Sequence, residues 1–261
     1  MARRRDELTD AQWGLIEALF PKPPKRRGKG RPPIEPRPIM NGVLWILRTG
    51  ARWKDLPEPV SAVPDLPPAV PALGTHRRAG EGAQGAGATI AGRSRFRLGP
   101  MLHRRQLCGG QKGGAAVGKT KRGKGTKLMA VANRAGAPLA VHIDSASPHE
   151  VKLAQATVDA RFTAKRPQRL IGDLAYDSDP LDQQLAERGI HLIAPHRENR
   201  VRPATQDRRE LRRYKRRWKV ERLFAWLHNF RRLVTRYEYH PENFLGFVHL
   251  GCMLILLRMY F

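Results

Sequence analysis

The stretch from Arg208 to Arg232 constrains the fold most, because it combines helical periodicity with a carboxylate on the predicted buried face. Tyr214, Arg217 and Glu221 are spaced three and four residues apart, and a helix places such residues on one face. Apolar residues recur at mostly helical spacing in the same stretch, which predicts one long amphipathic helix. A charge on a packed face is costly unless it is paired, hydrogen-bonded or bound to a metal. Glu221 is therefore either the partner of Arg217 in an ion pair or a metal ligand.

The charge of the chain indicates a polyanionic partner. Lys and Arg number 49 against 23 Asp and Glu, a formal net charge of +26 in 261 residues. Self-repulsion on this scale favours DNA or RNA as the partner, with a membrane surface as the weaker alternative. Two cysteines and the lack of an apolar run after Met1 indicate a reducing, cytoplasmic compartment. The apolar run 247–261 contains two basic side chains and is too short for a bilayer, so we expect a core helix and no membrane partner.

The N-terminal residues 1–57 predict a small helical domain. Thr9 and Gln12 have the spacing of a capping box, and a first short helix follows. After a basic loop, a second helix is expected between Pro38 and Gly50. Two short helices around a basic loop resemble a DNA-binding module, although a plain helical cap would have the same pattern.

The remainder divides into an irregular segment, 58–111, and a mixed α/β domain, 112–261. The first is dominated by Pro, Ala, Gly, Val and Arg and shows no useful periodicity, which predicts little order. The second predicts a hairpin, then strand, helix and strand, then the long helix, an order typical of a mixed sheet covered by helices. The strands are expected at 127–132, 138–143, 170–173 and 191–194, and shorter helices at 150–158 and 179–188.

The residues from Gly113 to Thr120 match the phosphate-loop pattern of nucleotide-binding proteins letter for letter. That mechanism requires the loop to follow an apolar strand and to open a helix, so that backbone amides converge on the phosphates. Neither neighbouring sequence fits this requirement. A basic loop that contacts DNA is the favoured interpretation, and ATP binding is the alternative.

A second acidic candidate is Asp173, at the C-terminal end of a predicted strand, where open sheets place ligand-binding groups. The plain alternative is a turn cap, because Asp173, Asp177 and Asp179 all lie in turn-like sequence. A strand-end aspartate and a helical glutamate in so basic a chain fit two-metal phosphodiester chemistry, which requires several carboxylates.

At these residues the chain resembles the DDE-type insertion-sequence transposases. Tyr214, Arg217 and Glu221 have the spacing of the signature around the last acidic residue of that family, and the segment 172–178 resembles its second acidic motif. Segments 8–13 and 50–57 resemble its opening domain. In one minor departure, His228 stands where the signature has a lysine.

The resemblance implies an RNase H-like catalytic fold, Mg²⁺ or Mn²⁺ as cofactor, and cleavage and strand transfer of double-stranded DNA at transposon ends and target. It also implies a homo-oligomer when active. Asp173 and Glu221 would be catalytic metal ligands, and Tyr214 and Arg217 would orient Glu221 or a phosphate. The expected DNA-contacting residues are Lys119, Lys121, Arg122, Lys124, Tyr214, Arg216, Arg217 and Lys219.

The first acidic residue of the family is missing, because there is no Asp or Glu between Glu81 and Asp144. With suitable codons, the segment 103–110 reads one base later as Ile-Asp-Gly-Asn-Phe-Val-Val-Ala, which resembles the missing motif. We therefore interpret residues 58–111 as an out-of-frame translation between two compensating frameshifts. Loss of one carboxylate predicts weak or absent metal binding, so a DNA-binding remnant without catalysis is the alternative to an active transposase. Asp144 is an unfavoured substitute, since it ends a different strand.

Overall fold

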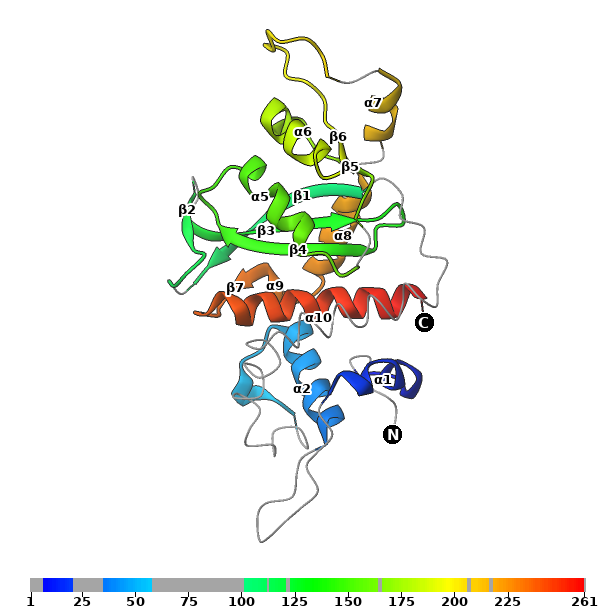
Figure 1. Cartoon of the computed structure of the whole chain (residues 1–261). Helices are drawn as coiled ribbons and strands as arrows, with labels where there is room; N and C mark the ends of the chain where they lie inside the picture. Colours follow the sequence, from blue (N-terminus) through cyan, green and yellow to red (C-terminus); the bar gives the residue numbers. More distant parts are fainter. Residues whose placement is uncertain are drawn as a thin grey trace.

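The structure is a computed structural model that describes residues 7–20, 35–57, 101–111, 113–120, 123–163, 166–205, 208–215 and 218–260, with the backbone alone over 101–106. It consists of a mixed sheet with helices on both faces (Figure 1). The elements are α1 (Asp10–Ile16), η1 (Glu17–Leu19), α2 (Pro36–Thr49), η2 (Trp53–Asp55), β1 (Met101–Gly110), β2 (Gly118–Thr120), β3 (Gly123–Ala132), β4 (Pro138–Ser145), α5 (Glu150–Asp159), β5 (Arg169–Ile171), η4 (Leu174–Tyr176), α6 (Asp179–Ala186), β6 (His191–Ile193), α7 (Arg208–Tyr214), α8 (Trp218–His228), α9 (Arg231–Val234), β7 (Thr235–Arg236) and α10 (Pro241–Tyr260).

The sheet joins an antiparallel half to a parallel half through β1. The antiparallel strands β4, β3 and β1 follow one another, and β5 and β6 continue in parallel beyond β1. The short strand β2 extends the hairpin side by pairing with the start of β3, and β7 pairs with the end of β1. This is the RNase H-like arrangement of a mixed sheet with flanking helices that the sequence predicted.

The strand β1 corrects the prediction for residues 58–111. Of that range the structure describes 101–111, and residues 101–110 form the central strand of the sheet instead of irregular chain. Sheet hydrogen bonds join backbone groups, so a central position can be filled by a sequence without strand-like alternation. The boundary expected at residue 111 therefore lies inside the sheet domain.

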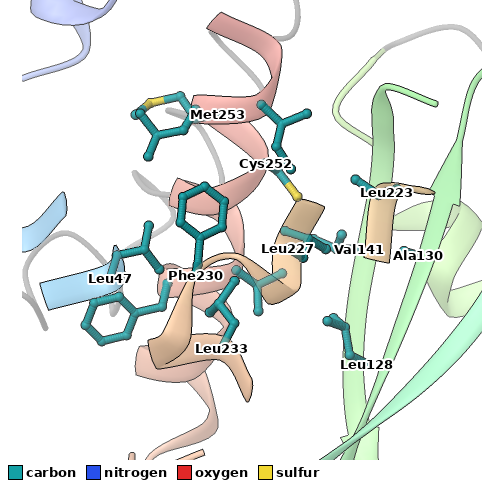
Figure 2. Packing of buried hydrophobic residues seen from close by; sticks show 14 of the residues in the cluster. Leu47, Leu128, Ala130, Val141, Leu223, Leu227, Phe230, Leu233, Cys252 and Met253 are labelled. Carbon is teal, nitrogen blue, oxygen red and sulfur yellow. The ribbon is translucent and has the colours of Figure 1, made fainter. Parts of the chain in front are cut away.

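The sheet is buried on both faces, and alternate residues of β3 serve two different cores. Leu128 and Ala130 face one core, shared with α8, α9 and α10, and Figure 2 shows Leu223, Leu227 and Cys252 converging on this side. Met129 and Val131 face the other core, beneath α5 and α6. All eight residues from 125 to 132 are buried, as expected for a strand covered on both faces.

The N-terminal helices belong to the first of these cores. The capping box at the start of α1 is present, with the Thr9 hydroxyl accepting from the Gln12 amide at 2.9 Å. The helix α2 ends at Gly50, whose φ is +70°. Glycine adopts this left-handed conformation without the steric clash that a Cβ causes in other residues. Leu47 of α2 lies in the same apolar cluster as Leu233 and Met253 (Figure 2), so the helical segment packs on α9 and α10.

The C-terminal helix α10 contributes many of the buried residues of the first core. By length and composition it is the one helix in the described ranges that could cross a membrane, and 61% of its most apolar window is buried within the protein. It contacts β4, α8, α9 and α2, on both of its sides in Figure 1. These contacts support the predicted core helix over the membrane alternative.

The single long helix predicted for 208–232 is wrong. The chain forms α7, α8 and α9 as separate helices, with residues 216 and 217 outside the described residues. The buried stripe of α8 consists of Val220, Leu223, Phe224 and Leu227. Glu221 is one position off this stripe and is exposed, so the expectation of a buried carboxylate is also wrong.

A buried arginine holds the base of the β2–β3 ribbon. Arg236 has no exposed surface, and all five of its guanidinium N–H groups have acceptors. Those acceptors are the carbonyls of Ala115, Ala116, Glu238 and Tyr239 and the hydroxyl of Thr126. One side chain thus joins the loop before β2, the strand β3 and the connection from β7 to α10.

Replacing Arg236 by lysine should destabilise the protein by about 2–4 kcal/mol, because a lysine has three donors and would leave buried carbonyls unpaired. Urea unfolding of Arg236→Lys measures this change. The control is Arg258→Lys on the exposed face of α10, for which a change under about 0.5 kcal/mol is expected. Equal losses in both variants would show that the hydrogen bonds of Arg236 contribute no special stability.

Burial also changes the titration of His249 on α10. The ring packs edge-on against Phe162 with 5.6 Å between centroids, and burial lowers its pKa from 6.5 to about 4. Between those values the unfolded chain takes up a proton that the folded chain does not. The free energy of unfolding must therefore fall as the pH drops from about 6.5 towards 4.

Between neutral and mildly acid pH, the free energy of unfolding of His249→Gln should fall by roughly 1–3 kcal/mol less than that of the parent protein. Thermal unfolding at a series of pH values measures the difference. His142, whose pKa burial also lowers, remains in both proteins and contributes equally. His240→Gln, at an exposed position, is the control for the effect of a histidine-to-glutamine change as such.

Candidate active site and nucleic-acid interface

Asp173 directly follows β5, as the sequence predicted. Its backbone is extended, and its Oδ1 accepts a hydrogen bond from the Ala175 amide at 2.9 Å, which caps the short helix η4. The side chain is partly buried. Asp173 therefore acts as a turn cap, the alternative that the sequence left open. The hydrogen bond from Ala175 uses one lone pair of Oδ1, and Oδ2 can still bind another partner.

Glu221 lies in the first turn of α8, on the helix that crosses β1 and β3. Tyr214 ends α7 and packs partly against the first core. Arg217, which completes the predicted signature, lies outside the described residues. Exposure places Glu221 where a solvent-borne ligand could reach it.

The strand β1 is the common neighbour of both acidic candidates. It pairs in parallel with β5, Leu102 opposite Ile171, and extending that register by two residues places Arg104 level with Asp173. Parallel neighbours are about 4.8 Å apart across the strands. In the shifted reading frame the aspartate falls at this same codon, so Arg104 stands where the first carboxylate of the family is expected.

The described residues do not fit a complete divalent metal site. In the part of the chain that the structure describes, no group of three His, Cys, Asp or Glu side chains lies close enough to hold an ion. Two carboxylates remain, one of them engaged as a cap. Mg²⁺ and Mn²⁺ prefer several oxygen ligands, and this donor set falls short of that requirement.

Asp144 lies three strand spacings from the β5 side of the sheet, where Asp173 lies. It lies on β4, separated from β5 by β3 and β1, a distance of about 14 Å across three strand spacings. Its Oδ1 accepts from the amide of Ser145 at 2.5 Å, so it also caps the end of its own strand. The geometry agrees with the sequence expectation that Asp144 is no substitute.

Two opposed lysines lie on the ribbon formed by β2 and the start of β3. Lys119 and Lys124 are directly opposite each other in the antiparallel register, and both are exposed. Like charges at opposed positions destabilise a strand pair. Lys121 and Arg122, which join the two strands, lie outside the described residues. A phosphate between the two lysines would remove their repulsion.

The ribbon also excludes the phosphate-loop alternative. The residues after the glycines form the strand β2, where nucleotide binding requires a helix N-terminus. The loop before it directs the carbonyls of Ala115 and Ala116 inward to Arg236. Gly114 has a φ of +116°, and a Cβ there would lie 2.4 Å from the Tyr239 carbonyl oxygen, so this glycine allows a close approach of two backbones and no nucleotide.

Of the other predicted DNA contacts, Lys219 is described and Arg216 is outside the described residues. The Lys219 Nζ donates to the carbonyl of Arg134 at 2.6 Å, and the neighbouring Arg222 donates to the carbonyl of Ala135 at 2.6 Å. These bonds join α8 to the hairpin turn between β3 and β4. Lys219 therefore has a structural partner in addition to any phosphate it could meet.

Sequence reasoning missed a polar cluster that holds the loop after β6. Asp177 accepts from the His196 Nδ1, the Arg197 amide and the Arg200 guanidinium at 2.7–2.8 Å. Burial pushes the pKa of Asp177 up, but the Arg197 and His196 hydrogen bonds and the charge of Arg200 outweigh it, so the pKa lies below its usual value. Asp179 pairs with Arg200 and Arg202, whose hydrogen bonds lower its pKa as well.

Because acid and base are far apart in the sequence, only the turn-like surroundings of Asp177 and Asp179 could have indicated this cluster.

A second missed contact is the pair of Lys127 and Glu150, which are 1% and 4% exposed. The Nζ and Oε1 atoms are 3.5 Å apart, and the Nζ also donates to the Pro148 carbonyl. This pair anchors the start of α5 on β3.

Comparison with known proteins identifies the class to which this arrangement belongs. The sequence profile described as "Transposase DDE domain" matches residues 100–257, more than half of the chain, and the chain therefore belongs to the DDE transposase family. A second profile, "Putative transposase of IS4/5 family", matches residues 8–64. The family assignment confirms the resemblance and the RNase H-like fold.

Individual relatives agree with this assignment. The chain is 33% identical over 139 residues to the "Putative transposase for insertion sequence element IS402" of Burkholderia cepacia, a match that covers 50% of this chain and 62% of the relative. It is 32% identical over 133 residues to the "Putative transposase for insertion sequence element IS6501" of Brucella ovis, covering 51% of this chain and 98% of that relative. A 52-residue match at 48% identity, 19% of this chain, covers 35% of an uncharacterized 16.2 kDa protein of IS402.

The opposed lysines lead to a test in which stability and binding change in opposite directions. Lys124→Glu places a carboxylate opposite Lys119 and should stabilise the folded protein by about 0.5 kcal/mol. The same change should weaken duplex DNA binding, because it removes one cation and adds an anion. Lys152→Glu on the exposed face of α5 changes the net charge equally without a cross-strand lysine, so it should not stabilise the protein. Denaturant unfolding and a salt-dependent binding assay provide the two measurements.

Proposed function

We propose that this chain binds double-stranded DNA at transposon ends and target, and that its own metal-dependent cleavage and strand transfer are lost. The observation that supports the proposal is the parallel pairing of Leu102 with Ile171, because a continuation of that register would bring position 104 level with Asp173. A homo-oligomer and a cytoplasmic location, both expected from the sequence, belong to the same proposal.

The DNA-binding half rests on charge and on the ribbon. A formal charge of +26 favours a polyanionic partner, and Lys119 lies directly opposite Lys124 on the exposed ribbon. Phosphate contacts of this kind position DNA without reading its sequence. Lys121, Arg122 and Arg216 would extend the same contact, and Tyr214 and Arg217 would orient Glu221 or a phosphate.

The proposed loss of catalysis rests on the residue type at position 104. Asp173 and Glu221 would be the two surviving metal ligands, on elements that both contact β1. In place of the aspartate expected at position 104 the sequence has Arg104, which removes one carboxylate ligand and substitutes a charge of the same sign as the ion. Like charges repel, so a divalent ion would be held weakly or not at all.

The experiment compares binding with chemistry in one preparation. A duplex carrying a transposon end should be retained by the protein in a mobility-shift assay, with an affinity that falls steeply as salt rises. In the same tubes with Mn²⁺, we expect neither nicking nor strand transfer. Nicking by the parent chain would overturn the loss of chemistry, and absence of duplex binding would overturn the DNA-binding half.

The matched comparison is a restored chain, in which residues 58–111 are translated in the shifted frame. This chain should regain nicking, because the aspartate returns at position 104. In the restored background, Asp173→Asn and Glu221→Gln should each abolish nicking while leaving duplex affinity within about threefold of the restored chain, since phosphate contacts dominate affinity. If Asp173→Asn remained active, the assignment of that residue as a ligand would be wrong.

A further inference from the structure

The loop between β6 and α7, which projects from the sheet in Figure 1, is closed at its base by a histidine. The Nδ1 atom of His196 lies 2.8 Å from Oδ1 of Asp177, and its Nε2 accepts a hydrogen bond from the Thr205 amide at 3.1 Å. His196 and Thr205 are nine positions apart, so this second bond joins the two ends of a compact loop. The side chain of His196 is 17% exposed, which leaves it within reach of solvent protons.

The two hydrogen bonds of the ring require its neutral form. The pKa of Asp177 lies below its usual value, because the hydrogen bonds from Arg197 and His196 and the charge of Arg200 outweigh the effect of burial. Asp177 is therefore an ionised acceptor, and the ring proton lies on Nδ1. A backbone amide can only donate, so Nε2 must be unprotonated to receive Thr205. Protonation of Nε2 would set two N–H groups against each other and break the bond.

A second partner for a charged ring is available on α6. Oδ2 of Asp182 accepts a hydrogen bond from the Thr205 hydroxyl at 3.2 Å. Burial raises the pKa of Asp182, and the Thr205 hydrogen bond and the charges of His196 and Arg200 offset this only in part. A partly buried carboxylate gains more from a cationic donor than from a neutral hydroxyl, because charge-assisted hydrogen bonds are the stronger ones. Asp182 would thus favour the charged form of His196.

The remaining charged groups of the loop do not titrate in the same pH range. Arg200 donates to Asp177 at 2.7 Å and to Asp179 at 2.5 Å, and also to the carbonyls of Arg202 and Pro203 at 3.0–3.2 Å. Arg202 pairs with Asp179 at 2.9 Å. Arginine keeps its proton, and the pKa values of both aspartates are lowered by these partners. The middle of the loop therefore stays bound to the start of α6 when the pH falls.

We propose that uptake of a proton by His196 opens the base of this loop through a change of partner. Nε2 gives up the Thr205 amide and donates to Asp182, and Asp182 in turn gives up the Thr205 hydroxyl. Thr205 loses both contacts three residues before α7 begins, so the connection to α7 is no longer held against α6. The proton comes from the solvent, and no other bond is made or broken.

The test measures backbone amide exchange by NMR on the full chain between pH 7.5 and 5.5, with each rate divided by the intrinsic rate at the same pH. Protection of the Thr205 amide should fall about tenfold, the effect of one proton taken up by an exposed imidazole over this range. The Arg197 amide, which donates to Asp177 at 2.8 Å, is the internal control and should keep its protection. The ring ¹⁵N shifts of His196 should show a proton on Nδ1 alone at pH 7.5.

Three variants separate the change of partner from a general loosening. In His196→Gln the side-chain oxygen can accept from Thr205 without titrating, so protection of this amide should be independent of pH. Asp182→Asn keeps an acceptor for the Thr205 hydroxyl and removes the charge, so the fall in protection should move to lower pH. The matched control is His191→Gln on β6, which removes a histidine 3.2 Å from Glu210 and should leave the fall unchanged.

Several outcomes would overturn the proposal. Constant protection of Thr205 between the two pH values, or the same fall in His196→Gln as in the parent chain, would show that His196 does not control the loop. Parallel loss of protection at Arg197 and Thr205 would show that the loop opens as a whole. A ring proton on Nε2 at pH 7.5 would contradict the hydrogen bonds from which the proposal starts. All these measurements are made without DNA, so their result does not depend on the proposed function.

Discussion

The two halves of the sheet are held together by the backbone hydrogen bonds of one strand. β1 pairs with β3 on the antiparallel side and with β5 and β7 on the parallel side. Without it, the hairpin side and the parallel side would share no strand among the described elements. Because these bonds involve peptide groups, they do not depend on which side chains the strand carries.

Burial on both sides of the sheet explains how the other elements are placed. Alternate residues of β3 supply two cores, and each core is closed by helices that come from different parts of the chain. The helix α10 completes the first core and receives the N-terminal helices on its far side (Figure 1). The segment that resembled a DNA-binding module, or alternatively a helical cap, packs on α9 and α10. Any DNA contact it makes must start from that fixed position.

The sequence predicted the parts of the fold that have a local signal. The capping box of Thr9, the glycine that ends α2 and the apolar strands around Leu128 and Leu170 are all encoded within a few residues. The long helix failed because helical spacing extends through 208–232 while the buried stripe of α8 begins only at Val220. The same offset explains why Glu221 is exposed instead of buried.

The residues of the candidate site can be proposed from the sequence, whereas their geometry cannot. Asp173 follows its strand as the pattern indicated, and its cap on Ala175 was the alternative that the turn-like sequence left open. The pairing of β1 with β5 joins residues that are 69 positions apart in the chain, for which no local pattern exists. The buried Arg236 and the cluster around Asp177 are likewise long-range.

The hydrogen bonds of Arg236 at the base of the β2–β3 ribbon differ from the contacts that the exposed lysines of the ribbon could make with phosphates. Its acceptors are neutral carbonyls and one hydroxyl, and a guanidinium does not lose its proton under ordinary conditions. Such an anchor responds little to ionic strength, whereas contacts between lysines and phosphates weaken as salt is added. High salt should therefore release a bound polyanion from the ribbon, while the hydrogen bonds of Arg236 at the base of the ribbon stay intact. The protein could then be recovered folded and bind again when the salt is diluted.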